Sequence, residues 1–119
     1  MEKCQLELEE KLDDLILNTI EKILLDIFGK KSLNSILLIM KKNYSLEWKD
    51  IPDRVDVFSK ALHKIFGKGS VIIENQIIEN LYLKLDLTFK WKKGYKFTNY
   101  INELRKWFKE TQRLDDRRP

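Results

Sequence analysis

The chain has 119 residues, of which 43% are hydrophobic and 35% are charged, and its formal net charge is +4 at pH 7. This length suits one domain with a buried core, and the composition excludes an intrinsically disordered chain. Cys4 is the single cysteine, which excludes an intramolecular disulfide and favours a reducing compartment. No uncharged apolar stretch is long enough for a membrane span, and the first residues are acidic where a secretory leader is basic. We therefore expect a cytoplasmic protein without a membrane partner.

The N-terminal third predicts two helices separated by a glycine. Apolar residues recur at helical spacing over 4–28, and Gly29 is the expected end of that helix. Ser32 is placed to cap the second helix, over 33–43. A short turn over 46–49 is expected to follow.

The middle of the chain predicts two further helices. A break is expected at Pro52, because the residue before a proline is displaced from helical geometry. Asp53 can cap a helix over 54–66, which Gly67 ends. Ser70 opens the next helix, which runs to about residue 85.

The pattern changes after residue 87. Aromatic and polar residues alternate on both sides of a turn at Gly94, which predicts a short β-hairpin near 88–97. Thr98 or Asn99 is expected to cap a last helix that ends near residue 111. The polar residues 112–119 are predicted to form a flexible tail of the single domain 1–111.

A short block is repeated within the chain. Residues 27–32 and 65–70 match at five of six positions as Ile-Phe-Gly-Lys-x-Ser, at an offset of 38 residues. A duplicated helical hairpin is favoured over convergence of helix-end chemistry. The fold class predicted is therefore all-α, a five- or six-helix bundle built on two similar hairpins.

Catalytic patterns are weak in this sequence. His63 is the only histidine, and it is expected at the polar edge of its helix, solvated or edge-packed. The two Gly-Lys-x-Ser stretches lack the earlier glycine and the strand of a phosphate loop. The carboxylates lie among lysines on helix faces, as solvated pairs do. We therefore expect no enzymatic activity and no metal or cofactor.

Positive charge and aromatic rings concentrate at the C-terminal end. Residues 88–119 hold ten Lys and Arg against four Asp and Glu, a net charge of +6, and seven of the 13 aromatic residues. Lysines that neutralise phosphates and rings that stack on unpaired bases are typical of nucleic-acid surfaces. The candidate contacts to nucleic acid or to another anionic partner are Lys90, Trp91, Lys92, Lys93, Tyr95, Lys96, Arg105, Lys106 and Lys109.

Alternation places the rings of the aromatic segment on one face, and a face of this kind more often covers the helical body than stacks on bases. A protein partner is also possible on this surface. The first helix is about 37 Å long at about 1.5 Å per residue, and a domain of this size is barely wider than that. This length predicts a homodimer through an apolar edge that includes Leu8, Leu12 and Leu15.

Residues about 7–87 resemble a family of small archaeal domains, the Nitrosopumilus output domain. The resemblance rests on Lys-Asn-Tyr-Ser-Leu-Glu-Trp-Lys-Asp-Ile-Pro over 42–52, on Ile-Phe-Gly-Lys-Gly-Ser over 65–70, and on the apolar positions of the following helix. It implies an all-α domain of archaeal regulatory proteins, with no catalytic residues. The function expected is a non-enzymatic, self-associating regulatory module of a thermophile, and the alternative is a nucleic-acid-binding protein.

Overall fold

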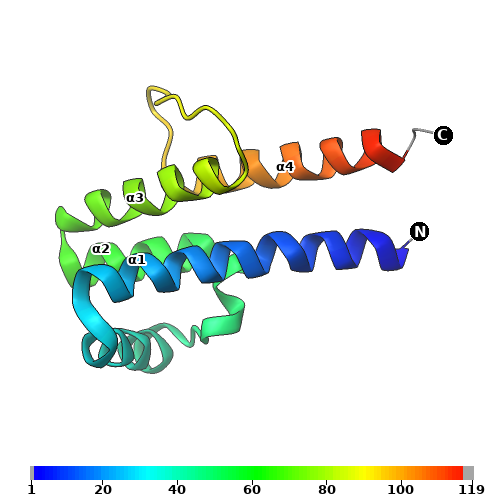
Figure 1. Cartoon of the computed structure of the whole chain (residues 1–119). Helices are drawn as coiled ribbons and strands as arrows, with labels where there is room; N and C mark the ends of the chain where they lie inside the picture. Colours follow the sequence, from blue (N-terminus) through cyan, green and yellow to red (C-terminus); the bar gives the residue numbers. More distant parts are fainter. Residues whose placement is uncertain (1, 117–119) are drawn as a thin grey trace.

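The computed structural model describes the backbone of residues 2–116 and the side chains of residues 10–111. Every regular element in this part is helical, which confirms the predicted all-α class (Figure 1). None of these helices has the combination of length and hydropathy that crossing a membrane requires. In chain order the elements are α1 (Glu2–Tyr44), the 3₁₀ helix η1 (Trp48–Asp53), α2 (Val55–Phe66), α3 (Gly69–Lys84) and α4 (Phe97–Asp116).

Gly29 divides α1 into a first segment, 2–28, and a second segment, 30–44. Its φ of 81° and ψ of 169° are non-helical and lie in a region that is open essentially to glycine alone. Gly67, with a φ of 58°, makes the corresponding break between α2 and α3. Both predicted helix ends are therefore confirmed, whereas Ser32 lies inside the second segment rather than before it.

The helix starts differ from those expected from capping chemistry. No side chain caps α2, so the predicted role of Asp53 is wrong. Ser70 lies within the first turn of α3, where its buried hydroxyl donates to the carbonyl of Gly67 at 2.7 Å. Asn99 lies within α4, and its side chain accepts a hydrogen bond from the amide of Lys96 at 2.9 Å. The side-chain bonds of Ser70 and Asn99 thus lie within the first turns of α3 and α4 rather than at the predicted capping positions.

The connection between α1 and α2 is helical at the proline that predicted a break. Ile51 and Pro52 are buried inside η1. A proline is tolerated there because the element is a short 3₁₀ turn rather than a helix interior. The guanidinium of Arg54 donates to the carbonyl of Ser45 at 2.7 Å and so ties the end of α1 to the start of α2.

The segment 85–96 is a loop, so the predicted β-hairpin is wrong. Its described backbone forms no strand, and its turn is closed by the Tyr95 amide, which donates to the carbonyl of Lys92 at 3.1 Å. Gly94 has a φ of 82° in this turn, as the sequence predicted. A two-stranded hairpin of this size is only marginally stable alone. Here the aromatic rings pack on helices, and the two halves of the segment do not pair through their backbones. Phe89, for example, lies edge-on to Tyr82 of α3, with ring centroids 5.0 Å apart.

The core lies where both segments of α1, η1, α2, α3 and α4 meet. Fully burying one large apolar side chain stabilises the fold by about 1.5–3 kcal/mol. The largest fully buried side chains are Phe58, Ile16, Ile20, Leu24, Met40, Leu46, Ile51, Leu62, Ile77, Ile78, Leu81 and Ile101.

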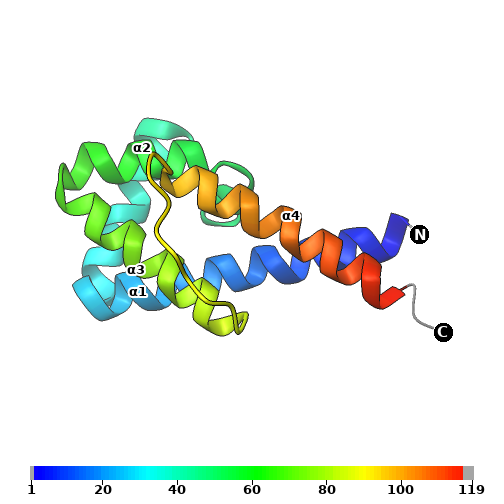
Figure 2. The same cartoon turned by 90° about the horizontal axis from the view of Figure 1, so that it is seen from above.

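Two of the residues predicted for self-association contact the core of the same chain. Leu12 is only 2% exposed, and Leu15 is partly buried and packs against the core. Self-association through this edge stays a prediction, and the side chain of Leu8 lies outside the described part. The covering element is α4, which runs antiparallel beside the first segment of α1 (Figures 1 and 2). This part of the apolar stripe of α1 is thus covered within one chain.

The two repeated blocks meet in the structure. Phe28 and Phe66, which occupy equivalent positions of the repeat, stack with ring centroids 4.8 Å apart and planes inclined by 14°. Contact between equivalent residues is what a local two-fold relationship between two hairpins would produce. The duplication itself stays a prediction.

The pair formed by the first segment of α1 and by α4 extends beyond the rest of the molecule (Figure 1). The overall extents are 49 × 31 × 23 Å. α4 continues to Asp116, through most of the region that was predicted to be a flexible tail. Residues 117–119 of that predicted tail lie outside the described part.

Candidate binding cleft

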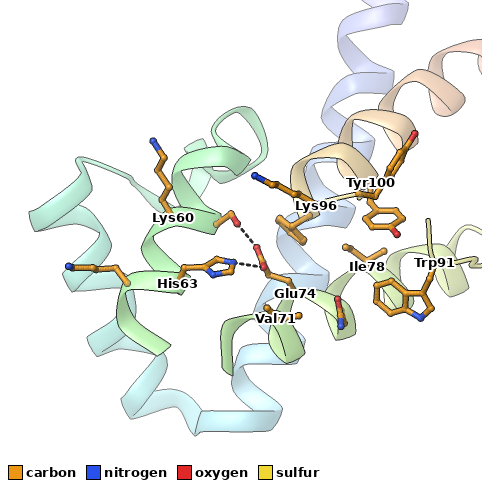
Figure 3. Close-up of a pocket in the computed structure, with 13 residues that line it drawn as sticks. Lys60, His63, Val71, Glu74, Ile78, Trp91, Lys96 and Tyr100 are labelled. Carbon is orange, nitrogen blue, oxygen red and sulfur yellow. Dashed lines mark hydrogen bonds and ion pairs between the residues drawn. The ribbon is translucent and has the colours of Figure 1, made fainter. Parts of the chain in front are cut away.

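A half-open cleft of about 710 Å³ lies between α2, α3, the loop 85–96 and the start of α4 (Figure 3). The segment that the sequence singled out as basic and aromatic forms one wall. The opposite wall comes from α2 and α3. The lining residues are Ser59, Lys60, His63, Lys64, Val71, Glu74, Asn75, Ile78, Trp91, Tyr95, Lys96, Phe97 and Tyr100.

The loop wall is held in place at its start and at its middle. At the end of α3, Asp86 has a φ of 57° and the amide of Leu87 donates to the carbonyl of Tyr82 at 2.8 Å. This bond from the residue after a left-handed position directs the chain away from the helix. At the middle, the buried Tyr100 hydroxyl accepts from the amide of Lys92 at 2.8 Å and fastens the loop to α4.

The rings of the loop wall divide into covered and accessible ones. Phe97 is buried in the core and Phe89 packs against it, so the alternative in which the alternating rings cover the helical body is correct for these two. Trp91 is 55% exposed and Tyr95 is 40% exposed, although both rest edge-on against Tyr100, with centroids 6.0 and 5.1 Å from its ring. The cleft therefore presents two supported aromatic rings to the solvent.

The charged groups of the cleft are mostly cationic. Lys60 and Lys64 come from α2, and Lys96 comes from the residue before α4 (Figure 3). Against these three ammonium groups stands one carboxylate, that of Glu74. With His63 neutral the formal charge of the lining is +2, so the cleft attracts anions.

Glu74 is a buried acid at the bottom of the cleft and is 6% exposed. Its Oε1 lies 2.9 Å from Nε2 of His63, and its Oε2 accepts from the Ser59 hydroxyl at 2.5 Å. The carboxylate stands between hydroxyl and imidazole, whereas a nucleophilic triad places the imidazole between them. In this geometry His63 is not in contact with Ser59 as a base. The Glu74 carboxylate is a hydrogen-bond acceptor that its two partners hold in place.

This cluster was not predicted from the sequence, where the acidic residues were interpreted as solvated faces and His63 as a solvated or edge-packed residue. A signal was present in the repeat, because Glu74 occupies the position that Ile36 holds in the first hairpin, and Ile36 is buried. An acid at a position where the duplicate is apolar indicates a buried polar site.

The predicted contact residues separate into groups. Trp91, Tyr95 and Lys96 line the cleft, whereas Lys90 and Lys93 lie exposed on the loop outside it. Lys92 pairs with Glu103 at 2.5 Å, and this hydrogen bond raises the pKa of its ammonium group.

The predicted contacts on α4 do not join the cleft. Arg105 pairs with Asp13 at 2.8 Å, donates to the carbonyl of Pro52 and is thereby committed to the fold. Lys106 and Lys109 lie further along α4, outside the lining.

Tyr82 lies behind the aromatic wall, on α3. Burial raises the pKa of its phenol above the usual value of 10.0, and the charge of Glu103 raises it further. The protonated phenol is therefore the form that suits the folded protein.

No protein-family model matches the chain, and neither the curated proteins nor the solved structures include a match. The resemblance to the Nitrosopumilus output domain therefore stays a prediction.

Proposed function

We propose that the protein binds single-stranded nucleic acid in the cleft between α2, α3 and the loop 85–96. One observation carries this proposal: Trp91 and Tyr95 are exposed rings, each resting on Tyr100, in a cleft that three lysines also line. Base–aromatic stacking contributes about 1–3 kcal/mol per base, and lysines supply the salt-dependent attraction to phosphates. Rings inside a cleft are reached by an unpaired base more readily than by a base stacked within a duplex.

An organic cation is the competing ligand for a cleft of aromatic rings and one acid. Aromatic cages recognise quaternary ammonium groups through the negative face of each ring. The lining here carries a formal charge of +2 with His63 neutral, and the acid, Glu74, already has two partners. Electrostatic repulsion from the lysines therefore disfavours a cation and favours an anion that also carries a flat ring.

The test is fluorescence anisotropy with a labelled mixed-sequence oligonucleotide, single-stranded or annealed, over a range of salt concentrations. Trp91→Ala should weaken single-strand binding by about 5- to 150-fold, which corresponds to the loss of one stacked base. Replacing Lys60, Lys64 or Lys96 by glutamine should reduce the slope of log K against log salt by about 0.7 each. Lys106→Gln is the matched control, because this lysine lies outside the cleft.

Two results would contradict the proposal. One is binding that ignores salt or that is absent at low salt. The other is a loss of affinity in Lys106→Gln as large as in the cleft variants, because contact would then be spread over the basic surface.

The predicted self-associating regulatory module is a second candidate function. The surface that supports it lies on α3, where Ile72 and Leu83 are exposed. These residues are eleven positions apart, about three helical turns, and therefore lie on the same face of the helix. A second copy of the chain would cover this stripe, in the archaeal cytoplasm that the resemblance implies. Sedimentation equilibrium tests it: dimerisation that Leu83→Lys abolishes would support the module, and a monomer at high concentration would refute it.

A further inference from the structure

We propose that Glu74 selects the base that enters the cleft, and that the base selected is guanine. This inference rests on the proposed function and names the ligand of the same site. The feature that carries it is a buried carboxylate, held in place by Ser59 and His63, that lines an aromatic, cationic cleft (Figure 3).

The two partners of Glu74 leave part of the carboxylate unused. An ionised carboxylate can accept about four hydrogen bonds, two on each oxygen. The contact with His63 uses one position on Oε1, and the bond from Ser59 uses one on Oε2. About one acceptor position therefore remains on each oxygen. These two bonds also fix the plane of the carboxylate, so the remaining acceptors are preorganised.

Two acceptor positions on one negative group match two adjacent N–H donors. Guanine offers such a pair on its pairing edge, at N1 and at the exocyclic N2. Adenine and cytosine each place a ring-nitrogen acceptor beside their amino donor, and uracil flanks its single N–H with two carbonyls. The charge of Glu74 would repel these acceptors, because like partial charges destabilise a complex. Charge-assisted pairs of this bidentate type are about twice as strong as neutral ones.

The other walls of the cleft fit the rest of a guanine nucleotide. The base can stack on Trp91 or Tyr95, since both rings are exposed toward the cleft. A phosphate would be neutralised by the lysines of α2 or by Lys96. The same chemistry is offered by a free nucleotide and by a guanine within a single strand, and the experiment must separate these sources.

The experiment is isothermal titration of the full chain with GMP, IMP, AMP, CMP and UMP. IMP is the sharpest comparison, because it differs from GMP by the N2 amino group alone. We expect GMP to bind about tenfold or more tightly than IMP, the effect of one hydrogen bond to a charged group. Glu74→Gln should bring GMP to the level of IMP, because an amide retains one acceptor and presents a donor to the other N–H.

The controls separate recognition from folding and from stacking. Glu79→Gln changes an exposed acid of the same helix and should keep the GMP preference. Trp91→Ala should weaken all five nucleotides without changing their order. If Glu74→Gln fails to fold by circular dichroism, Ser59→Ala combined with Glu74→Ile provides a second variant without the carboxylate, and it should also lose the preference.

The outcomes distinguish this inference from the proposed function. Equal binding of the five nucleotides, with affinity lost in Trp91→Ala, would overturn the role of Glu74 and leave single-strand binding standing. A GMP preference that survives in Glu74→Gln would also overturn it. Absence of nucleotide and oligonucleotide binding at low salt would overturn both.

The source of the guanine is decided by a thymidine oligonucleotide with one guanine at its centre. Tighter binding of this strand than of GMP would support both proposals. Equal affinities would support guanine recognition and overturn the nucleic-acid part of the proposed function, because flanking phosphates would then contribute nothing.

Discussion

Replacing Ser59 by alanine and Glu74 by isoleucine together should leave the domain about as stable as the wild type, although Ser59→Ala alone should destabilise it. The single change removes a hydrogen bond to a buried carboxylate, a loss of about 1.5–3 kcal/mol in the free energy of unfolding. Glu74 itself is 6% exposed and keeps only its contact with His63 in that variant. The remaining burial of the charge is then poorly compensated.

The double variant has neither the hydroxyl nor the carboxylate. Replacing a buried ionic group and its partner by apolar side chains of similar volume is often neutral or stabilising by about 1–4 kcal/mol. Isoleucine suits this position, because Ile36 at the equivalent position of the first hairpin is buried. His63 is largely solvated, with 47% of its side chain exposed, so losing Glu74 leaves it hydrated.

Urea unfolding, followed by tryptophan fluorescence at constant pH, measures both variants. We expect the double variant to fall within about 1 kcal/mol of the wild type, with an unchanged m-value. A double variant that loses as much stability as the sum of the single changes would refute this reasoning. Glu74 would then be an anchor between α2 and α3, and its burial would need no role in recognition.

Three further predictions concern the helix junctions and the aromatic wall. Gly29→Ala should lower the free energy of unfolding by about 1–3 kcal/mol, because the positive φ and extended ψ of Gly29 suit glycine alone. Gly69→Ala in α3, where an added Cβ meets open space, should raise it by about 0.4–1 kcal/mol. Equal urea midpoints for the two variants would contradict this. A double-mutant cycle between Phe28 and Phe66 should give a coupling energy of about 0.5–1.5 kcal/mol, and additive losses would exclude the stack. Because the pKa of Tyr82 is raised above 10.0 in the folded protein, its contribution is complete below that pH and is lost as pH rises through the raised pKa. Tyr82→Phe should flatten this alkaline decline in unfolding free energy, and an unchanged pH profile would refute the assignment.

Local patterns in the sequence were sufficient for the helices and their interruptions. Helical periodicity predicted the elements around the core, and Gly29, Gly67 and Gly94 marked the positions that need positive φ. These features depend on residues close together in the chain, where backbone sterics and side-chain spacing decide the outcome. The helix starts were less accurate, because one cap contributes only about 1 kcal/mol and several neighbouring polar residues can serve as caps.

Contacts between distant segments decided what the sequence left open. The apolar stripe of α1 that includes Leu12 has the same sequence pattern whether another copy or another helix of the same chain covers it. In the structure the covering element is α4. The alternation of 88–97 suits a strand, yet the hydroxyl of Tyr100 and the ring of Tyr82 hold that segment as a loop.

The sequence by itself determined an all-α chain, its glycine breaks and a basic, aromatic C-terminal end. Tertiary structure alone joined part of that end to α2 and α3 and placed Glu74 in the same cleft as the exposed rings. The reason is physical: spacing along a helix records which side of it is apolar, but not which residue of another helix that side meets. Glu74, Ser59 and His63 come together only where α2 packs on α3.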